Sequence, residues 1–263
     1  MSIQRIWGLV LRHLFLLRRS FPRILEIFYW PLFDLLVWGF LSVYLARFQQ
    51  NLPNFVLFFI GALILWDILF RSQAGISVSF LEDVWSKNLL NIFAGPVHTG
   101  EYLAALMVVS FVKLSFSAIL LSGLAWLIYS FNIFVLGMSL LPIFLNLVIF
   151  GWVIGILTTA LILRLGQEAE VLAWALGILF MPVSAVFYPV DVLPAFLRAV
   201  AHWVPSSHVF EGMRTILGTG VFPIRNFLWA LGLNALYLCG VFLFFNWNFR
   251  VIKRKGLLVR IGE

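Results

Sequence analysis

Three ionisable side chains lie within long apolar stretches of the sequence, where a charge needs a partner. Asp34, Asp67 and Lys113 each fall inside a stretch long enough to cross a bilayer. Such groups are costly at membrane depth and usually face a bundle interior or a water-filled cavity. Asp67 and Lys113 are a possible ion pair, and Arg71, four residues after Asp67, offers a local alternative. The pattern indicates charge pairing or the lining of a transport path. A proton relay is not predicted, because no chain of acidic residues crosses the membrane.

The other residues that could do chemistry are scattered. Four histidines lie near the predicted ends of apolar stretches without metal-ligand spacing, so we expect no metal site. The single cysteine excludes an internal disulfide framework. No polar cluster indicates a catalytic site, and the sequence has no G-x-x-x-x-G-K-[ST] phosphate loop. The four histidines are His13, His98, His202 and His208, and the cysteine is Cys239.

The composition is that of an integral membrane protein. The chain is 63% hydrophobic and 11% charged, whereas a soluble domain carries roughly 25% charged residues. A helix needs ~20 apolar residues to cross the hydrocarbon core. We therefore predict an all-α membrane protein in which residues 1–263 form one transmembrane domain with six spans. The expected spans are about 24–46, 54–75, 102–129, 138–163, 169–188 and 225–248.

Lys and Arg residues predict the orientation. Thirteen of the 18 lie in the N-terminal segment, in the tail 249–263, and in the loops after the second and fourth spans. This excess predicts that both termini are cytoplasmic, in the cell (inner) membrane. Anionic lipid headgroups then account for the net charge of +7, and we expect no nucleic-acid partner. The opposite side carries Arg47, Arg198, Arg214 and Arg225.

The N-terminal segment 1–22 has the pattern of an amphipathic helix. Arg5, Arg12 and Arg19 recur every seven residues and therefore share one face. We interpret the segment as a helix lying in the cytoplasmic interface, with an ordinary basic anchor as the alternative. Ser20-Phe21-Pro22 is expected to break it. The apolar face comprises Ile3, Ile6, Val10, Leu14 and Leu17.

The longest predicted cytoplasmic loop, 77–100, contains a short apolar helix. The helix is expected over 84–93 and ends at Gly95-Pro96. Thr99 can cap the third span, with Glu101 in its first turn. The short helix is suited to a groove in a partner protein or to lying on the bilayer, and its sequence leaves both open. Its apolar residues are Val84, Trp85, Leu89, Leu90, Ile92 and Phe93.

Residues 187–214, "FYPVDVLPAFLRAVAHWVPSSHVFEGMR", are too broken and charged to cross a bilayer as one helix. Prolines at 189, 194 and 205 divide the stretch, and we expect two short helices within 189–218. Glu211 and Arg214 could pair across one helical turn. An apolar face is predicted for Phe196, Val200, Trp203 and Val204.

This order of elements resembles the membrane subunit of ATP-binding cassette type-2 export permeases. Residues 82–103, "EDVWSKNLLNIFAGPVHTGEYL", are similar to the family's acidic start, short helix, apolar-Pro pair and Glu that opens the third span. Residues 188–214 are similar to its apolar-Tyr-Pro, Leu-Pro and P-x-x-x-x-x-E-x-x-R signature. The resemblance covers nearly the whole chain. The signature positions are Tyr188, Pro189, Leu193, Pro194, Pro205, Glu211 and Arg214.

The resemblance implies partners and roles. Two membrane subunits would pair, as a homodimer, with two separate cassettes that bind ATP and Mg²⁺; this chain would hold no cofactor. Residues 84–93 would be the coupling helix seated in the cassette, and 1–22 a connector that moves with it. Residues 189–218 would re-enter the outer leaflet as an extracellular gate, and spans 1, 2 and 5 would face the pathway.

The substrate is expected to be an amphiphile. Polysaccharide exporters of this family have a Gly pattern and spaced Trp and Pro residues at the start of the first span, whereas Trp30 and Pro31 are adjacent here. This departure favours export of a drug-like or lipid-like molecule over a polysaccharide or lipid-linked glycan. An ion-coupled secondary transporter is the alternative of another class, although the two halves of the chain do not visibly repeat.

Overall fold

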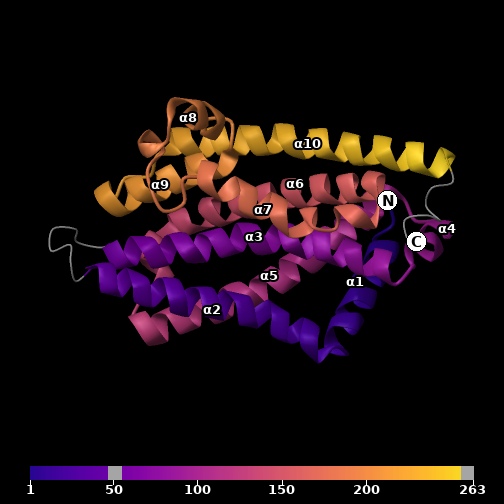
Figure 1. Cartoon of the computed structure of the whole chain (residues 1–263), viewed down its shortest axis with the longest axis horizontal. Helices are drawn as coiled ribbons and strands as arrows, with labels where there is room; N and C mark the ends of the chain where they lie inside the picture. The colour runs from indigo at the N-terminus through magenta and orange to yellow at the C-terminus, as the bar shows by residue number, and fades with distance from the viewer. Residues whose placement is uncertain (47–54, 256–263) are drawn as a thin grey trace.

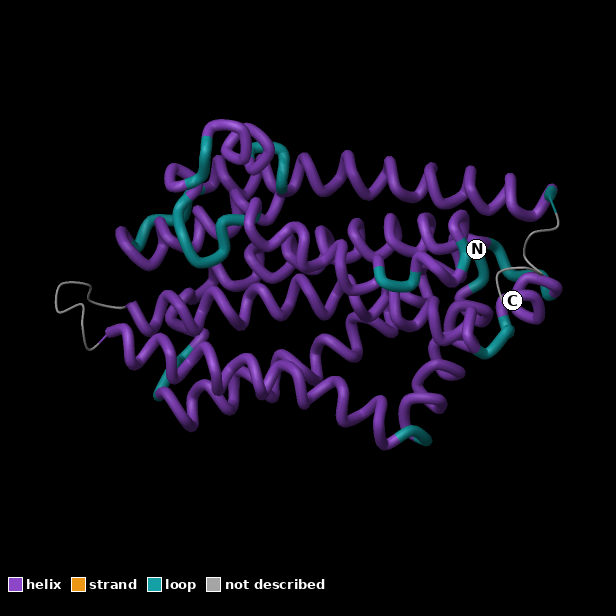
Figure 2. The backbone as a smooth tube through the Cα atoms, viewed as in Figure 1, coloured by secondary structure: helices purple, strands orange, loops and turns teal. Residues whose placement is uncertain are grey.

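The computed structural model describes residues 1–46 and 55–255. All regular structure in these residues is helical, and the long helices run side by side (Figures 1 and 2). The predicted all-α class is confirmed. Arg47, Arg260 and the predicted tail beyond residue 255 lie outside the described residues.

Helix α1 (Ile3–Arg18) is the predicted amphipathic helix, and the chain turns at Arg19 and Ser20 before α2 (Phe21–Ala46) begins. Pro22 stands in the first turn of α2, where the missing N–H costs no intrahelical hydrogen bond. The predicted break is therefore confirmed. Val10 is buried in the main core and Ile6 and Leu14 pack against it, whereas Ile3 and Trp7 are exposed. The apolar face of α1 therefore packs largely on this protein's own helices.

In the part of the chain that the structure describes, five helical segments are long and apolar enough to cross a membrane. Four are the single helices α2, α3 (Phe55–Trp85), α5 (Thr99–Tyr129) and α10 (Ile224–Arg254). The fifth joins η1 (Ile133–Ser139) to α6 (Leu140–Leu165). Helix α5 begins one residue after its N-cap His98, so Thr99 is the first helical residue and not the cap.

The predicted fifth span, 169–188, was too long. The chain instead forms η2 (Gln167–Ala169), helix α7 (Leu172–Val183) and then turns. Twelve residues rise about 18 Å, which is less than the hydrocarbon thickness of about 30 Å. The helix ends just after Pro182, and Ala185 adopts a left-handed conformation with φ of 52°. Helical geometry cannot continue through that residue.

Helix α3 is the centre of the bundle and is the most buried of the candidate spans. Its close neighbour is α6, which brings Gly151 and Gly155 against the α3 backbone. A Cβ on Gly151 would stand 2.6 Å from the Leu69 carbonyl oxygen, and one on Gly155 would stand 2.9 Å from that of Gln73. Small residues four apart let two membrane helices approach closely. This contact fixes α3 and therefore the polar groups it carries.

The two ends of the bundle carry different elements. Helix α1, the short helix α4 (Leu89–Ala94) and the last turn of α10 lie at one end, here named the α4 end (Figure 1). Helices α8 (Ala195–Ala201) and α9 (Pro205–Thr219) lie at the opposite α8 end, together with η3 (Val190–Val192). This arrangement matches the predicted order along the chain.

The predicted pair of short helices within 189–218 is present as α8 and α9, and most of the predicted apolar face is not buried in this chain. Phe196 and Trp203 are exposed, and of the predicted face only Val204 is buried. The buried surface belongs to α9, which contributes Val209, Phe210 and others to the main core. Helix α9 packs between α6 and α10 and holds the loop that follows α7.

Candidate functional site

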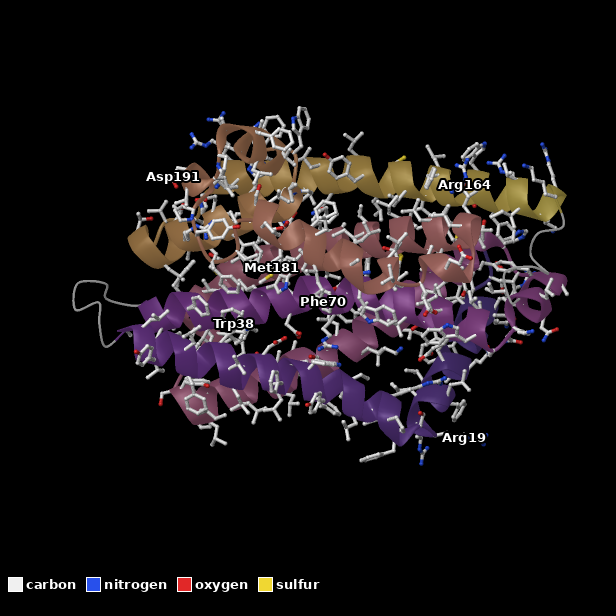
Figure 3. The ribbon with its side chains drawn as sticks, in the orientation of Figure 1. Arg19, Trp38, Phe70, Arg164, Met181 and Asp191 are labelled. Atoms are coloured by element: carbon white, nitrogen blue, oxygen red, sulfur yellow. The ribbon has the colours of Figure 1, made fainter. Side chains whose placement is uncertain are left out.

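A cavity of about 420 Å³ lies between α2, α3 and α7, with one residue from α5. Figure 3 shows Trp38, Phe70 and Met181 converging from these three helices. The wall is mostly aromatic and aliphatic, with a few polar groups, as is typical of ligand pockets of this size. The indole rings are those of Trp30, Trp38, Trp66 and Trp174.

The charged groups that line the cavity come from α2 and α3. Arg71 Nε donates to Asp67 Oδ1 at 3.1 Å, and the Ser117 hydroxyl donates to Asp67 Oδ2 at 3.1 Å. Lys113 Nζ instead donates to Ser79 Oγ at 3.0 Å. Of the two predicted arrangements, the structure therefore forms the local Asp67–Arg71 pair and not the Asp67–Lys113 pair.

Asp34 is the third charged group of the cavity. It stands at the midpoint of α2 and is exposed to the cavity side rather than packed in the core. Residues 30, 34 and 38 are spaced by four, so Trp30 and Trp38 flank this carboxylate on one helix face. Asp34 has no hydrogen bond or ion pair within residues 1–46 and 55–255.

An aromatic stack bounds the cavity toward the α8 end. The rings of Phe59 and Phe187 stack with centroids 4.6 Å apart, and each lies 6.1 Å from the Trp38 ring. Phe187 belongs to the loop after α7, so this stack joins the cavity wall to the predicted gate. Phe187 is not among the predicted gate residues, although it directly precedes the Tyr188-Pro189 motif.

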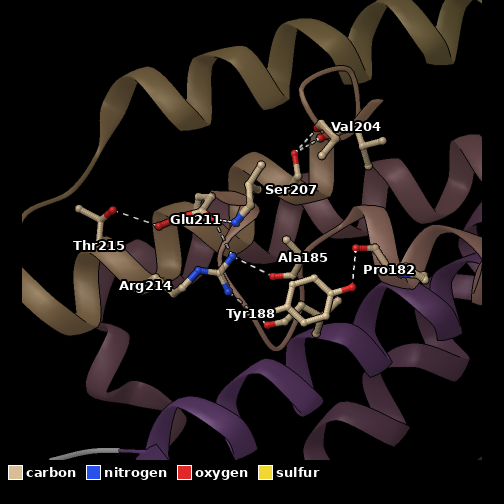
Figure 4. A network of polar contacts seen from close by, with 11 residues as sticks. Pro182, Ala185, Tyr188, Val204, Ser207, Glu211, Arg214 and Thr215 are labelled. Atoms are coloured by element: carbon tan, nitrogen blue, oxygen red, sulfur yellow. Dashed lines mark hydrogen bonds and ion pairs between the residues drawn. The ribbon is translucent and has the colours of Figure 1, made fainter. Parts of the chain in front are cut away.

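Two ionic side chains of α9 hold the loop that follows α7, the predicted gate loop (Figure 4). Arg214 Nη2 donates to the Ala185 carbonyl at 2.8 Å and pairs with Glu211 Oε1 at 3.0 Å. Glu211 Oε1 also accepts the main-chain N–H of Val190 at 2.7 Å. The predicted Glu211–Arg214 pair is thus formed, and it fixes the loop from both sides.

The remaining predicted gate residues shape the chain around this network. The Tyr188 hydroxyl donates to the Pro182 carbonyl at 2.9 Å. Pro189 and Pro194 directly precede η3 and α8, and Pro205 is the first residue of α9. Leu193 is buried.

A buried ionic cluster joins α1 to α3 and α5 near the α4 end. The Asp83 carboxylate lies 2.7 Å from Arg12 Nη1 and 3.4 Å from His13 Nε2, and it accepts a hydrogen bond of 2.8 Å from the Tyr102 hydroxyl. The Asp83 side chain has no exposed surface. Buried charges are tolerated where they are paired and hydrogen-bonded, so this cluster fixes α1 in one position.

Two further ion pairs surround the cluster. Arg5 Nη1 lies 3.5 Å from Glu101 Oε2, and Arg23 Nε lies 3.3 Å from Glu82 Oε1. Arg5 and Arg12, which share one face of α1, therefore both contact acids of the bundle. A small cavity of about 60 Å³ lined by Arg23 and Glu82 shares Arg71 with the central cavity.

The predicted coupling helix is divided in the structure. Val84 and Trp85 end α3, a turn with Lys87 at φ of 53° follows, and α4 covers Leu89–Ala94. Its apolar residues do not form one exposed face: Val84, Leu89 and Ile92 are buried in the core, and Phe93 packs on Tyr102 and Phe249. The two that remain exposed are Trp85 and Leu90.

The chain matches a family model described as "ABC-2 type transporter" over residues 12–217, more than three-quarters of its length. No protein of curated function matches it. The matched region includes the ionic cluster of α1, the central cavity, α4 and the α9 network.

Proposed function

The chain belongs to the ABC-2 type transporter family, and we propose that it is the membrane subunit of an ATP-driven exporter of amphiphiles. The substrate would be drug-like or lipid-like and would leave the cytoplasm or the inner leaflet. The observation that carries this proposal is the central cavity of about 420 Å³, which combines indole rings with a few ionic groups inside an apolar bundle.

The arrangement of the cavity supports a path through this subunit. The cavity opens between α2, α3 and α7, the helices that correspond to predicted spans 1, 2 and 5. The small cavity near Arg23 and Glu82 extends it toward the α4 end through the shared Arg71. The Trp38–Phe59–Phe187 stack bounds it toward the α8 end. These features are those expected of an entrance, a chamber and a gate.

The cavity favours an amphiphile over a glycan. Its charged groups are few, and Arg71 and Asp67 are occupied with one another. A sugar chain needs many hydrogen-bonding partners, because a buried hydroxyl without a partner costs free energy. Aromatic and aliphatic walls instead suit an apolar body with one polar group.

The energy would come from a separate cassette that binds ATP and Mg²⁺, since this sequence lacks a phosphate loop. We propose that the α4 end faces the cytoplasm and that the cassette contacts Trp85 and Leu90, which are exposed apolar residues there. The ionic cluster around Asp83 would carry α1 with α3 when the cassette moves. A second copy of the chain would complete the pathway.

ATP-dependent transport in proteoliposomes tests the proposal. The chain and the cassette that co-purifies with it would be reconstituted together, and a fluorescent amphiphile would be supplied on the cassette side. We expect the amphiphile to cross only with hydrolysable ATP. Phe187→Ala, which removes the stack, should raise ATP-independent leakage, whereas Phe196→Ala, at an exposed aromatic of the same end, should not. Equal movement with and without ATP would contradict the proposal.

A further inference from the structure

We propose that the central cavity binds a lipophilic organic cation, with Asp34 as the group that recognises its charge. This inference rests on the proposed function, because it names the class of amphiphile that the same cavity takes. It is carried by the position of Asp34, the pairing of the other charges and the arrangement of the indole rings.

The first step is the charge of the cavity. Among the described residues that line it, the charged ones are Asp34, Asp67 and Arg71. Arg71 and Asp67 neutralise one another at 3.1 Å, and Ser117 adds a second hydrogen bond to the same carboxylate. The cavity therefore has one carboxylate, that of Asp34, that forms no hydrogen bond or ion pair in the part of the chain that the structure describes. It interacts at longer range with Arg71 and Asp67, which are already paired with one another.

The second step is the position of that carboxylate. Asp34 lies at the midpoint of an apolar helix, and its side chain is not covered by other residues of this chain. A charged side chain at this depth is costly unless it faces a counter-charge or water. A monovalent cation in the cavity would supply the counter-charge.

The third step is the aromatic wall. Trp30 and Trp38 flank Asp34 on the same face of α2, and Trp66 and Trp174 line the cavity from α3 and α7. Indole is the side chain with the strongest attraction for cations over its ring face, and this attraction increases when the cation is desolvated. The same rings would cover the apolar body of the ligand. An anionic amphiphile would meet the Asp34 carboxylate and be repelled.

The test uses the full chain with its co-purified cassette in lipid nanodiscs. The probes are tetraphenylphosphonium and tetraphenylborate, which have nearly the same shape and opposite charge. We expect saturable binding of tetraphenylphosphonium at least tenfold tighter than that of tetraphenylborate. Asp34→Asn should weaken cation binding at least tenfold, and Asp34→Glu should retain it within about threefold, since it keeps the charge. Asp191→Asn, at an exposed acid of the α8 end, should change nothing.

Three results would overturn the inference: equal binding of the two probes, binding of neither, or full cation binding by Asp34→Asn. Because the wild type alone compares the two probes, the inference stays testable if Asp34→Asn does not fold. ATP hydrolysis in the same nanodiscs reports separately on the proposed function. If amphiphiles change the rate of ATP hydrolysis but cations are not preferred, the cation inference fails and the exporter proposal stands. If no amphiphile changes the hydrolysis rate of the wild type, the exporter proposal itself fails.

Discussion

Arg214, on α9, donates a hydrogen bond of 2.8 Å to the main-chain carbonyl of Ala185, the residue at which the chain leaves α7. The two residues belong to elements on either side of the predicted gate loop. Ala185 has φ of 52°, a conformation that L-residues rarely adopt, so the surrounding structure must hold it. Arg214 provides part of that support. Phe187, two residues later, stacks on Phe59 and on Trp38, which lines the central cavity.

Arg214→Gln should therefore loosen the predicted gate loop. The substitution removes the charge-assisted bonds to Ala185 and Glu211, and hydrogen bonds to charged groups contribute about 1.5–3 kcal/mol each. We expect a loss of unfolding free energy of that order, together with ATP-independent leakage of amphiphile. Thermal unfolding and proteoliposome leakage measure the two effects. Arg225→Gln, at an exposed arginine of the same end, is the matched control. If Arg214→Gln lowers the free energy of unfolding but does not change the leakage of amphiphile, Arg214 contributes to folding alone.

Local pairs could be predicted from the sequence, and long-range ones could not. Glu211–Arg214 and Asp67–Arg71 are three and four residues apart, so helical spacing alone places them together. Arg12–Asp83 and Arg214–Ala185 depend on how helices pack, which no spacing encodes. The gate residues Glu211 and Arg214 were therefore predicted, while the main-chain groups that they bind, at Ala185 and Val190, were found only in the structure.

The two short apolar elements show the limits of periodicity. Helix α4 has six residues and apolar side chains on more than one side, so its pattern does not distinguish an inward face from an outward one. The predicted span 169–188 is mostly apolar, but Pro182 and the left-handed Ala185 end the helix early. Composition predicted that both segments are apolar, whereas backbone geometry decided their shape.

Leu90→Asp should prevent cassette binding without unfolding the membrane subunit. Leu90 is exposed on α4, and a carboxylate there would be poorly accommodated in an apolar groove. Leu89→Asp, by contrast, should destabilise the subunit, because Leu89 is buried. Co-purification and thermal unfolding separate the two. Val221→Asp changes an exposed apolar residue at the opposite end and should affect neither. Normal co-purification of Leu90→Asp would contradict the assignment of the docking surface.

Asp83→Asn should release α1 from the bundle. It leaves Arg12 and His13 beside a neutral side chain, and removal of one partner of a buried ion pair costs about 3–5 kcal/mol. We expect faster trypsin cleavage after Arg18 and Arg19, which are exposed where α1 joins α2. Glu168→Gln, at an exposed acid, is the control. Cleavage at the wild-type rate would show that the cluster does not hold α1.

The proposed orientation can be tested with single cysteines. Cys239 is exposed, so the background is Cys239→Ser. Ser86 and Ala199 are exposed at the two ends of the bundle, whereas Ser206 is buried and hydrogen-bonded to Ser184. We expect an impermeant maleimide to label Ala199→Cys in intact cells and Ser86→Cys only after permeabilisation. The reverse pattern would place the α4 end outside.

The most direct test of the exporter account is a pull-down of the intact chain from detergent-solubilised native membranes, followed by an ATPase assay. The account predicts a stoichiometric ATP-binding partner whose hydrolysis rate changes when an amphiphile is added. Recovery of the chain without a nucleotide-dependent partner would contradict it, and an ion-coupled secondary transporter would then become the leading explanation.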